Sequence, residues 1–257
     1  MIRIIAAWLL LATSLVRGES GSDKLLESGV VEFNAAYQAW NPEQFLRAAA
    51  LFRQASTNST ASALSFYWIG ATEFHRMLQL QSAPSSPASA SMAQLAGDAA
   101  IAALNRAVDL DPRHAESHAL LGTLYGMKIN GNLLRVLRFG PRVQKHQEMA
   151  LKHGAENPRV RYLLGTCQFH MAKKPEAWQE ALATFLAAEQ LFLGEIRQPP
   201  QPLDPRWGYS SCLTFIGRTY VLLGRSKEAA DYFRKAIALH PADHLAQEGL
   251  LGISRLK

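Results

Sequence analysis

The stretch LTFIGRTYVLLGRSKEAADYFRKAIALHP, residues 213–241, decides the fold of this chain. Apolar side chains recur at helical spacing on both sides of Gly224, which predicts two amphipathic helices joined by a turn. Gly217 in the first helix and Ala229 in the second are small enough for the helices to approach closely, and Phe233 can fill the space between them. The stretch therefore predicts a packed helical hairpin.

The same stretch resembles one unit of the tetratricopeptide repeat (TPR) family. The resemblance rests on nine positions at the spacing of that repeat: Leu213, Ile216, Gly217, Tyr220, Gly224, Ala229, Phe233, Ala236 and Pro241. It implies a right-handed solenoid of stacked hairpins that holds a partner and does not catalyse a reaction. Because a single hairpin cannot bury its own apolar face, further copies are expected upstream.

Weaker copies of the pattern do occur upstream of this repeat. They comprise Ala48, Phe52 and Ala55; Ile69 and Gly70; Ala100, Leu104, Ala107 and Pro112; Leu121, Gly122 and Tyr125; Leu164 and Gly165; and Ala181, Phe185 and Ala188. We therefore expect an all-α fold, a right-handed TPR-like solenoid of about five helical hairpins with a C-terminal capping helix. The hairpins and the capping helix, from about Ala242 to Leu256, form a single domain over residues 23–257.

The spacing between the copies also predicts three insertions. They lie near residues 82–92, 130–141 and 194–204, and we expect them to be flexible loops. The sequence Trp207-Gly208-Tyr209 directly follows the third insertion and is a candidate to anchor it on the core.

Residues 1–18 have the pattern of a signal peptide. Arg3 is followed by an apolar run over residues 4–12, and residues 16–18 offer a cleavage site. The run is too short to span a bilayer comfortably. We expect an exported protein of the bacterial type, periplasmic or secreted, with the segment either cleaved or retained as an anchor.

Basic residues are concentrated in the middle of the chain. The whole chain has 27 Lys and Arg against 21 Asp and Glu, a net charge of +6, while residues 113–174 hold eleven basic and three acidic residues, or +8. We predict a basic surface that includes Arg135, Arg138, Arg142 and Lys145. It either docks on an acidic peptide, an anionic envelope polymer or lipid head groups, or is only a solvated helix face. No nucleic-acid-binding motif accompanies the charge, so nucleic acid is not expected as a partner.

In TPR proteins the first helix of each hairpin lines a concave groove, so the resemblance implies which residues face a partner. Carried over residue by residue, this groove consists of Tyr67, Phe74, His75, Thr123, Arg159, Tyr162, Phe169, His170 and Arg218. Such a groove would take an extended peptide or an amphipathic helix of a partner protein. The paired Lys and Asn residues by which chaperone-binding members hold a C-terminal carboxylate are missing. The aromatic residues Tyr162 and Phe169 are equally expected as core residues between repeats.

Histidine and cysteine residues give little support for a catalytic or metal site. His114 and His118 are four residues apart, as two zinc ligands on a helix would be, but no third ligand is evident nearby, which favours capping or surface roles. Cys167 and His170 are favoured as core packing over a nucleophile and its base. Cys167 and Cys212 permit a disulfide, although two buried thiols are favoured. No metal or cofactor is expected.

The leading hypothesis is an exported, non-catalytic scaffold that binds a peptide or protein partner in its concave groove. The alternative is a structural or adaptor subunit that docks through the basic surface, residues 113–174, to an anionic envelope component. A metal-dependent enzyme that uses His114, His118 and a remote ligand is a third hypothesis. The sequence leaves the oligomeric state open.

Overall fold

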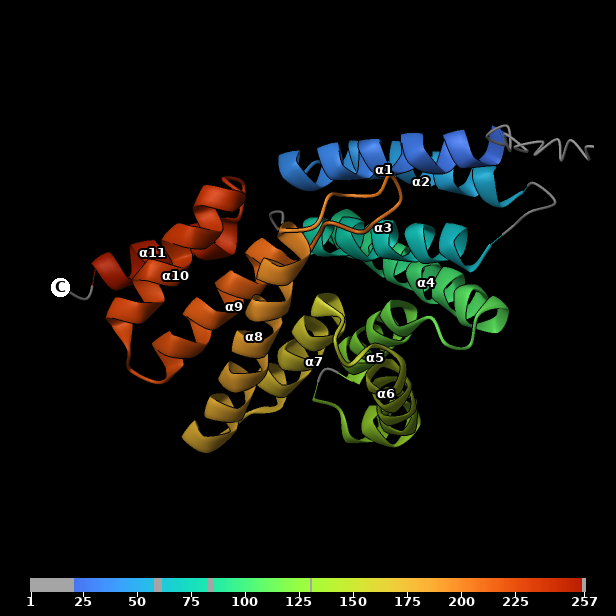
Figure 1. Cartoon of the computed structure of the whole chain (residues 1–257). Helices are drawn as coiled ribbons and strands as arrows, with labels where there is room; N and C mark the ends of the chain where they lie inside the picture. The colour runs from blue at the N-terminus through green and yellow to red at the C-terminus, as the bar shows by residue number, and fades with distance from the viewer. Residues whose placement is uncertain (1–20, 58–61, 83–85, 130, 256–257) are drawn as a thin grey trace, which may run out of the picture.

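The computed structural model describes residues 21–57, 62–82, 86–129 and 131–255. The signal segment expected at residues 1–18 lies outside them. All regular secondary structure in the described residues is α-helical (Figure 1). The helices are α1 (Gly21–Ala39), α2 (Pro42–Ser56), α3 (Ala63–Ser82), α4 (Pro87–Leu110), α5 (Ala115–Ile129), α6 (Leu133–Gly154), α7 (Pro158–Met171), α8 (Pro175–Ile196), α9 (Tyr209–Leu222), α10 (Ser226–Leu239) and α11 (His244–Ser254).

Consecutive helices pack as five hairpins, α1 with α2, α3 with α4, α5 with α6, α7 with α8, and α9 with α10 (Figure 1). The last helix, α11, packs on α10, where Gly249 lies against the ring of Phe233. This final helix covers apolar surface that α10 would otherwise expose. The predicted all-α array of about five hairpins with a closing helix is therefore confirmed.

In four of the five hairpins, a glycine of the first helix leaves room for a large side chain of the second helix. The pairs are Gly29 with Phe52, Gly70 with Leu104, Gly165 with Phe185, and Gly217 with Phe233. At Gly217, for example, an added Cβ would lie 2.7 Å from a ring carbon of Phe233, which is closer than two carbon atoms can pack. In the remaining hairpin Gly122 faces the flexible side chain of Gln147 instead. At this position the α5–α6 hairpin therefore meets through a flexible polar side chain, where the other four hairpins place an aromatic ring or a leucine.

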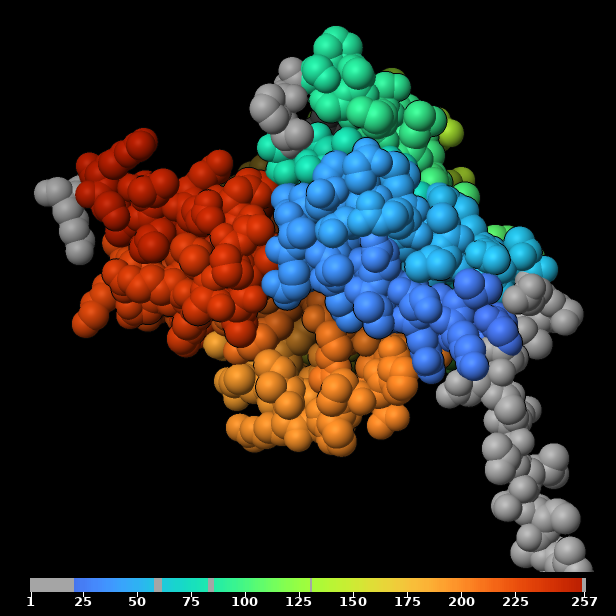
Figure 2. Space-filling model, turned by 90° about the horizontal axis from the view of Figure 1, so that it is seen from above, coloured from blue at the N-terminus to red at the C-terminus, as the bar shows by residue number. Residues whose placement is uncertain are grey.

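The first and last hairpins approach each other in space. The ring of Tyr37 in α1 stacks on the ring of His240, with 5.1 Å between their centroids, and the Tyr37 hydroxyl lies 3.3 Å from the hydroxyl of Ser210. Figure 2 shows the blue N-terminal hairpin against the red C-terminal helices. Segments that are about 170 residues apart in the chain thus share one buried contact, and the array curves back on itself.

Two of the three segments expected to be flexible loops are helical over most of their described length. In the first, Ser86 accepts a hydrogen bond from the Ser89 backbone N–H and caps α4, so α4 already begins at Pro87. In the second, Asn132 caps α6 in the same way and the helix continues through Pro141. The third differs, because α8 ends at Ile196 and residues 197–208 form no helix.

None of the helices in the described part of the chain combines the length and the apolar character that crossing a bilayer requires.

Candidate functional site

Residues 197–208, which we call the covering segment, lie against the first helices of several hairpins (Figure 1). Trp207 is only 1% exposed; its indole N–H donates to the Tyr67 hydroxyl over 3.0 Å, and its ring meets the edge of His75. The next residue, Gly208, has a φ of 100° and donates its backbone N–H to the Tyr37 hydroxyl over 3.4 Å. In a TPR protein the first helices of the hairpins line the groove. The covering segment therefore lies over part of the surface that would line such a groove here.

A buried ionic network lies under this segment. The Arg159 guanidinium donates to a carboxylate oxygen of Glu116 over 2.8 Å and to one of Glu195 over 3.1 Å. Asn157 and Tyr67 also donate to Glu116. Burial alone raises the pKa of Glu116, but the charge of Arg159 and these hydrogen bonds outweigh it, and the net pKa is lowered. The charge of Arg159 is thus satisfied within the protein.

The predicted groove residues divide into a buried set and an accessible set. Tyr67, Phe74, His75, Arg159, Tyr162 and Phe169 are buried. Thr123 is half-buried and donates to the Ala119 carbonyl, His170 is exposed, and Arg218 is half-buried. The six buried side chains are core residues and do not line an open groove, because neighbouring repeats and the covering segment enclose them. Helical spacing indicates which face points inward, but it does not show what covers that face.

Two of the accessible residues, His170 and Arg218, converge at the junction of α7 and α9, whereas Thr123 lies on α5. The Arg218 guanidinium carbon lies 5.2 Å from the ring centroid of Phe169 and 5.1 Å from that of Phe215. The ring of His170 meets Phe215 edge-on at 5.8 Å. We call these four residues the Arg218 platform. Phe215 was absent from the predicted set, although it lies three residues before Arg218 and thus on the same helix face.

The charge of Arg218 is not neutralised by an ion pair. Within the described residues, no carboxylate oxygen lies within 4.0 Å of its guanidinium nitrogens. Burial lowers the pKa of this guanidinium, and the more distant Asp243 and Glu248 offset the effect only in part. A half-buried guanidinium that rests on two aromatic rings is chemically able to bind a carboxylate.

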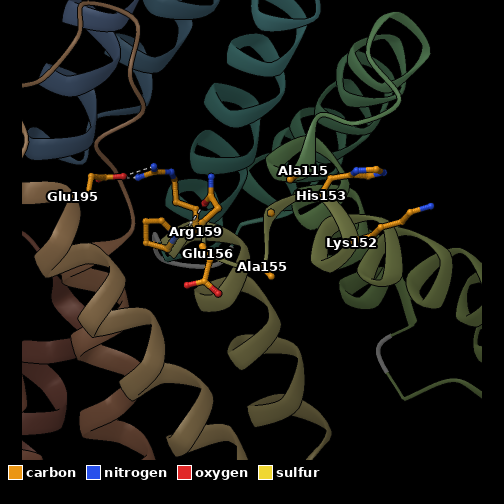
Figure 3. Close-up of a pocket in the computed structure, with 10 residues that line it drawn as sticks. Ala115, Lys152, His153, Ala155, Glu156, Arg159 and Glu195 are labelled. Carbon is orange, nitrogen blue, oxygen red and sulfur yellow. Dashed lines mark hydrogen bonds and ion pairs between the residues drawn. The ribbon is translucent and has the colours of Figure 1, made fainter.

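A shallow hollow of about 530 Å³ lies where α6 meets α7 (Figure 3). Its charged lining is mixed, with Lys152 and His153 opposite Glu156 and Glu195. Figure 3 shows that Arg159, which also lines the hollow, points to Glu195 and pairs with it. The hollow therefore presents no single charge to a ligand.

The four residues predicted as a basic surface lie together on α6. Arg135, Arg138, Arg142 and Lys145 are all exposed. None of them forms an ion pair in the part of the chain that the structure describes. The prediction did not include the three exposed leucines of the same helix, Leu133, Leu134 and Leu137.

The histidines singled out in the sequence have different structural roles. His114 accepts a hydrogen bond from the Ser117 backbone N–H and caps α5. His118 is buried, and its Nδ1 lies 2.8 Å from Nδ1 of His146 on α6. No group of three or more potential ligands from His, Cys, Asp and Glu gathers in the described residues. The His118–His146 pair could not be found from sequence spacing, because 28 residues separate its members.

Both cysteines are free thiols. Cys167 is half-buried and Cys212 is buried. Burial raises the pKa of each thiol, which opposes formation of the reactive thiolate.

Comparison with known proteins agrees with the architecture. Residues 210–243 match the family described as "Tetratricopeptide repeat". No curated protein matches the sequence. A thermophilic TPR protein of Thermus thermophilus has a similar structure, with a TM-score of 0.61, 15% identity, and coverage of 90% of this chain and 98% of that one. The HusA haemophore of Porphyromonas gingivalis has a TM-score of 0.62 and 13% identity, with coverage of 80% and 96%.

At these identities the similarity concerns the fold alone. The chain contains a tetratricopeptide repeat and has the fold of a TPR protein. TPR proteins are in general non-catalytic scaffolds for protein–protein interaction.

Proposed function

We propose that this chain is an exported, non-catalytic scaffold that binds an extended peptide segment of a partner protein, and that the Arg218 platform holds a carboxylate of that peptide. The proposal rests on one observation, the unpaired guanidinium of Arg218 over the rings of Phe169 and Phe215. Arginine binds carboxylates with two parallel hydrogen bonds, and the rings restrict the positions that its side chain can take. Less conformational entropy is therefore lost when the peptide binds.

Apolar contacts are available beside this charge. Met171, the residue after His170, is 75% exposed, and Val221 is 42% exposed one turn after Arg218. A peptide with an acidic residue next to an apolar one would match both features. The covering segment limits the peptide to the α7–α9 part of the wall, since Trp207 occupies the wall near α3.

The binding experiment uses a displayed peptide library with the purified chain as bait, followed by fluorescence titration with synthetic copies of the selected peptides. We expect the selected peptides to share an acidic residue, and Arg218→Gln to weaken their binding by about tenfold or more, because a charged hydrogen bond contributes about 1.5–3 kcal/mol. Arg234→Gln, an exposed arginine of α10, is the matched control. Equal binding by Arg218→Gln and the unmodified chain would show that the Arg218 platform takes no part in peptide binding.

Export is tested separately. Residues 1–22 are fused to a phosphatase that is active only outside the bacterial cytoplasm. Phosphatase activity that disappears when the apolar run at residues 4–12 is interrupted by Lys residues supports export. An inactive fusion contradicts it.

A further inference from the structure

The N-terminal half of α6 exposes four large apolar side chains, Val136 and three leucines. Leu133, Leu134 and Leu137 are 75%, 77% and 71% exposed. Only His146 and Ala150, both in the C-terminal half of the helix, are buried. The first two turns of α6 thus contribute little to the core, and their leucines are unpartnered in the described part of the chain.

The leucines and the cations of α6 occupy adjacent faces. At about 100° per residue, Leu133, Leu137 and Leu134 fall within an arc of about 100°. The next arc, of about 80°, contains Lys145, Arg138, Arg142 and Arg135. The residues that face α5, including Phe139 and His146, lie on the remaining side. The solvent side of α6 is therefore an amphipathic surface with one apolar and one cationic strip.

No ion pair joins the cationic strip to an Asp or Glu among the residues that the structure describes. No Asp or Glu occurs between Gly131 and Gln147. Arg138 and Arg142 lie over the rings of Phe139 and Tyr125, and Arg135 donates to the Lys128 carbonyl over 3.4 Å. These contacts orient the side chains and leave their charges unneutralised. A ligand for this surface must combine negative charge with apolar material.

We propose that α6 docks this protein on an anionic lipid bilayer, a function separate from peptide binding at the Arg218 platform. Leu133, Leu134 and Leu137 insert among the acyl chains, while Arg135, Arg138, Arg142 and Lys145 contact the head-group phosphates. Interfacial helices bind membranes by this combination of apolar burial and attraction to anionic lipid. The long basic side chains can reach the phosphates while the helix lies in the interface.

The shape of the surface favours a bilayer over an acidic protein. Helix α6 lies at the edge of the array (Figure 1), its first leucines are more than 70% exposed, and they line neither the hollow beside α7 nor the small one between α5, α6 and α7. A bilayer deforms around projecting side chains, whereas a protein would need a matching cavity.

The experiment measures flotation of the full chain with large unilamellar vesicles of phosphatidylcholine, with or without an equal amount of phosphatidylglycerol. We expect binding to the anionic vesicles only. Each cation near an anionic surface contributes about 1 kcal/mol, so replacing any one of the four by Gln lowers the partition coefficient by about fivefold. The triple variant Leu133→Ser, Leu134→Ser, Leu137→Ser should lower it by about tenfold or more, since buried leucines stabilise insertion.

Matched controls use exposed residues elsewhere. Leu95→Ser and Leu251→Ser remove leucines that are 64% and 57% exposed, and Arg106→Gln and Arg234→Gln remove exposed arginines. These variants, and Arg218→Gln, should float like the unmodified chain. Circular dichroism verifies that every variant folds.

Three outcomes would overturn the proposal. They are no flotation with anionic vesicles at low salt, equal flotation with neutral vesicles, and unchanged flotation of the triple leucine variant. The last outcome would mean that only electrostatic adsorption occurs, and it would leave peptide binding at the Arg218 platform untouched.

Discussion

Trp207 donates its indole N–H to the hydroxyl of Tyr67, a residue 140 positions earlier in the chain. Tyr67 in turn donates to Glu116, which binds Arg159. The hydrogen bonds thus continue from the covering segment through α3 and α5 into α7. This connection explains why a stretch with four prolines and no helix holds a defined position on the wall of the array.

Removing the indole should destabilise the whole array. For Trp207→Ala we expect the free energy of unfolding to fall by about 3–5 kcal/mol, because a fully buried aromatic side chain is lost and a cavity remains. Urea unfolding followed by circular dichroism measures the change. Trp178→Ala, at a half-buried position of α8, is the control and should cost much less. Similar losses for both variants would mean that Trp207 has no special anchoring role.

Glu116→Gln tests the buried network. Because it removes one partner of the buried ion pair with Arg159, we expect it to lower the free energy of unfolding by about 3 kcal/mol or more. The control is Glu32→Gln, which breaks the exposed pair with Arg47 and should lower the free energy of unfolding by less than about 1 kcal/mol. Because folding lowers the pKa of Glu116, its stabilising effect is fully present above the ordinary carboxyl pKa of about 4.3 and is lost as pH falls through the folded value. The difference in the free energy of unfolding between the unmodified chain and Glu116→Gln should therefore shrink in acid. A difference that stays constant from pH 7 to pH 3 would contradict this.

The His118–His146 pair makes stability depend on pH in the acidic range. His118 Nε2 lies 3.0 Å from the Pro112 carbonyl and so donates its proton there, which leaves Nδ1 to accept from His146. Burial lowers the pKa of both rings, to about 4 for His146. The unfolded chain therefore binds more protons between about pH 4 and 6.5, and stability falls as pH falls through this range.

The variant His146→Phe keeps a ring that can stack on Tyr125 and removes one titrating group. Its stability should fall less between pH 6.5 and pH 4 than that of the unmodified chain, in which each histidine contributes at most about 1.4 kcal/mol per pH unit. Urea midpoints across this range provide the measurement. Parallel pH profiles for the two proteins would show that the pair does not govern the acid loss.

Gly217→Ala tests the close approach of α9 and α10. The added Cβ would lie 2.7 Å from the Phe233 ring, which is fully buried and also faces Gly249 and so cannot move aside freely. We expect a loss of about 1–3 kcal/mol in the free energy of unfolding. Gly126→Ala is the matched control, because no atom lies within 4 Å of its new Cβ, and alanine there should stabilise the helix by up to about 1 kcal/mol. Stabilisation by both substitutions would refute the packing role of Gly217.

The hairpins could be predicted because their determinants are local. Gly217 and Phe233 belong to one hairpin, and the period of the apolar residues fixes which sides of two adjoining helices meet. The same reasoning identified Phe52, Leu104 and Phe185 in the weaker repeats. The helical parts of residues 82–92 and 130–141 were missed, since departures from repeat length were interpreted as loops, although Ser86 and Asn132 are good helix caps.

The sequence by itself determined the repeat architecture and the concentration of charge on residues 113–174. Only the tertiary structure decided which of the predicted groove residues are accessible, because that depends on contacts such as Trp207 with Tyr67 and Arg159 with Glu116. These contacts join residues from different repeats, and no periodicity within a helix encodes them. The burial of a side chain depends on all the residues packed around it. For this reason Arg159 is a buried core residue, whereas Arg218, on the equivalent helix of another hairpin, is half-buried and forms no ion pair with a described residue.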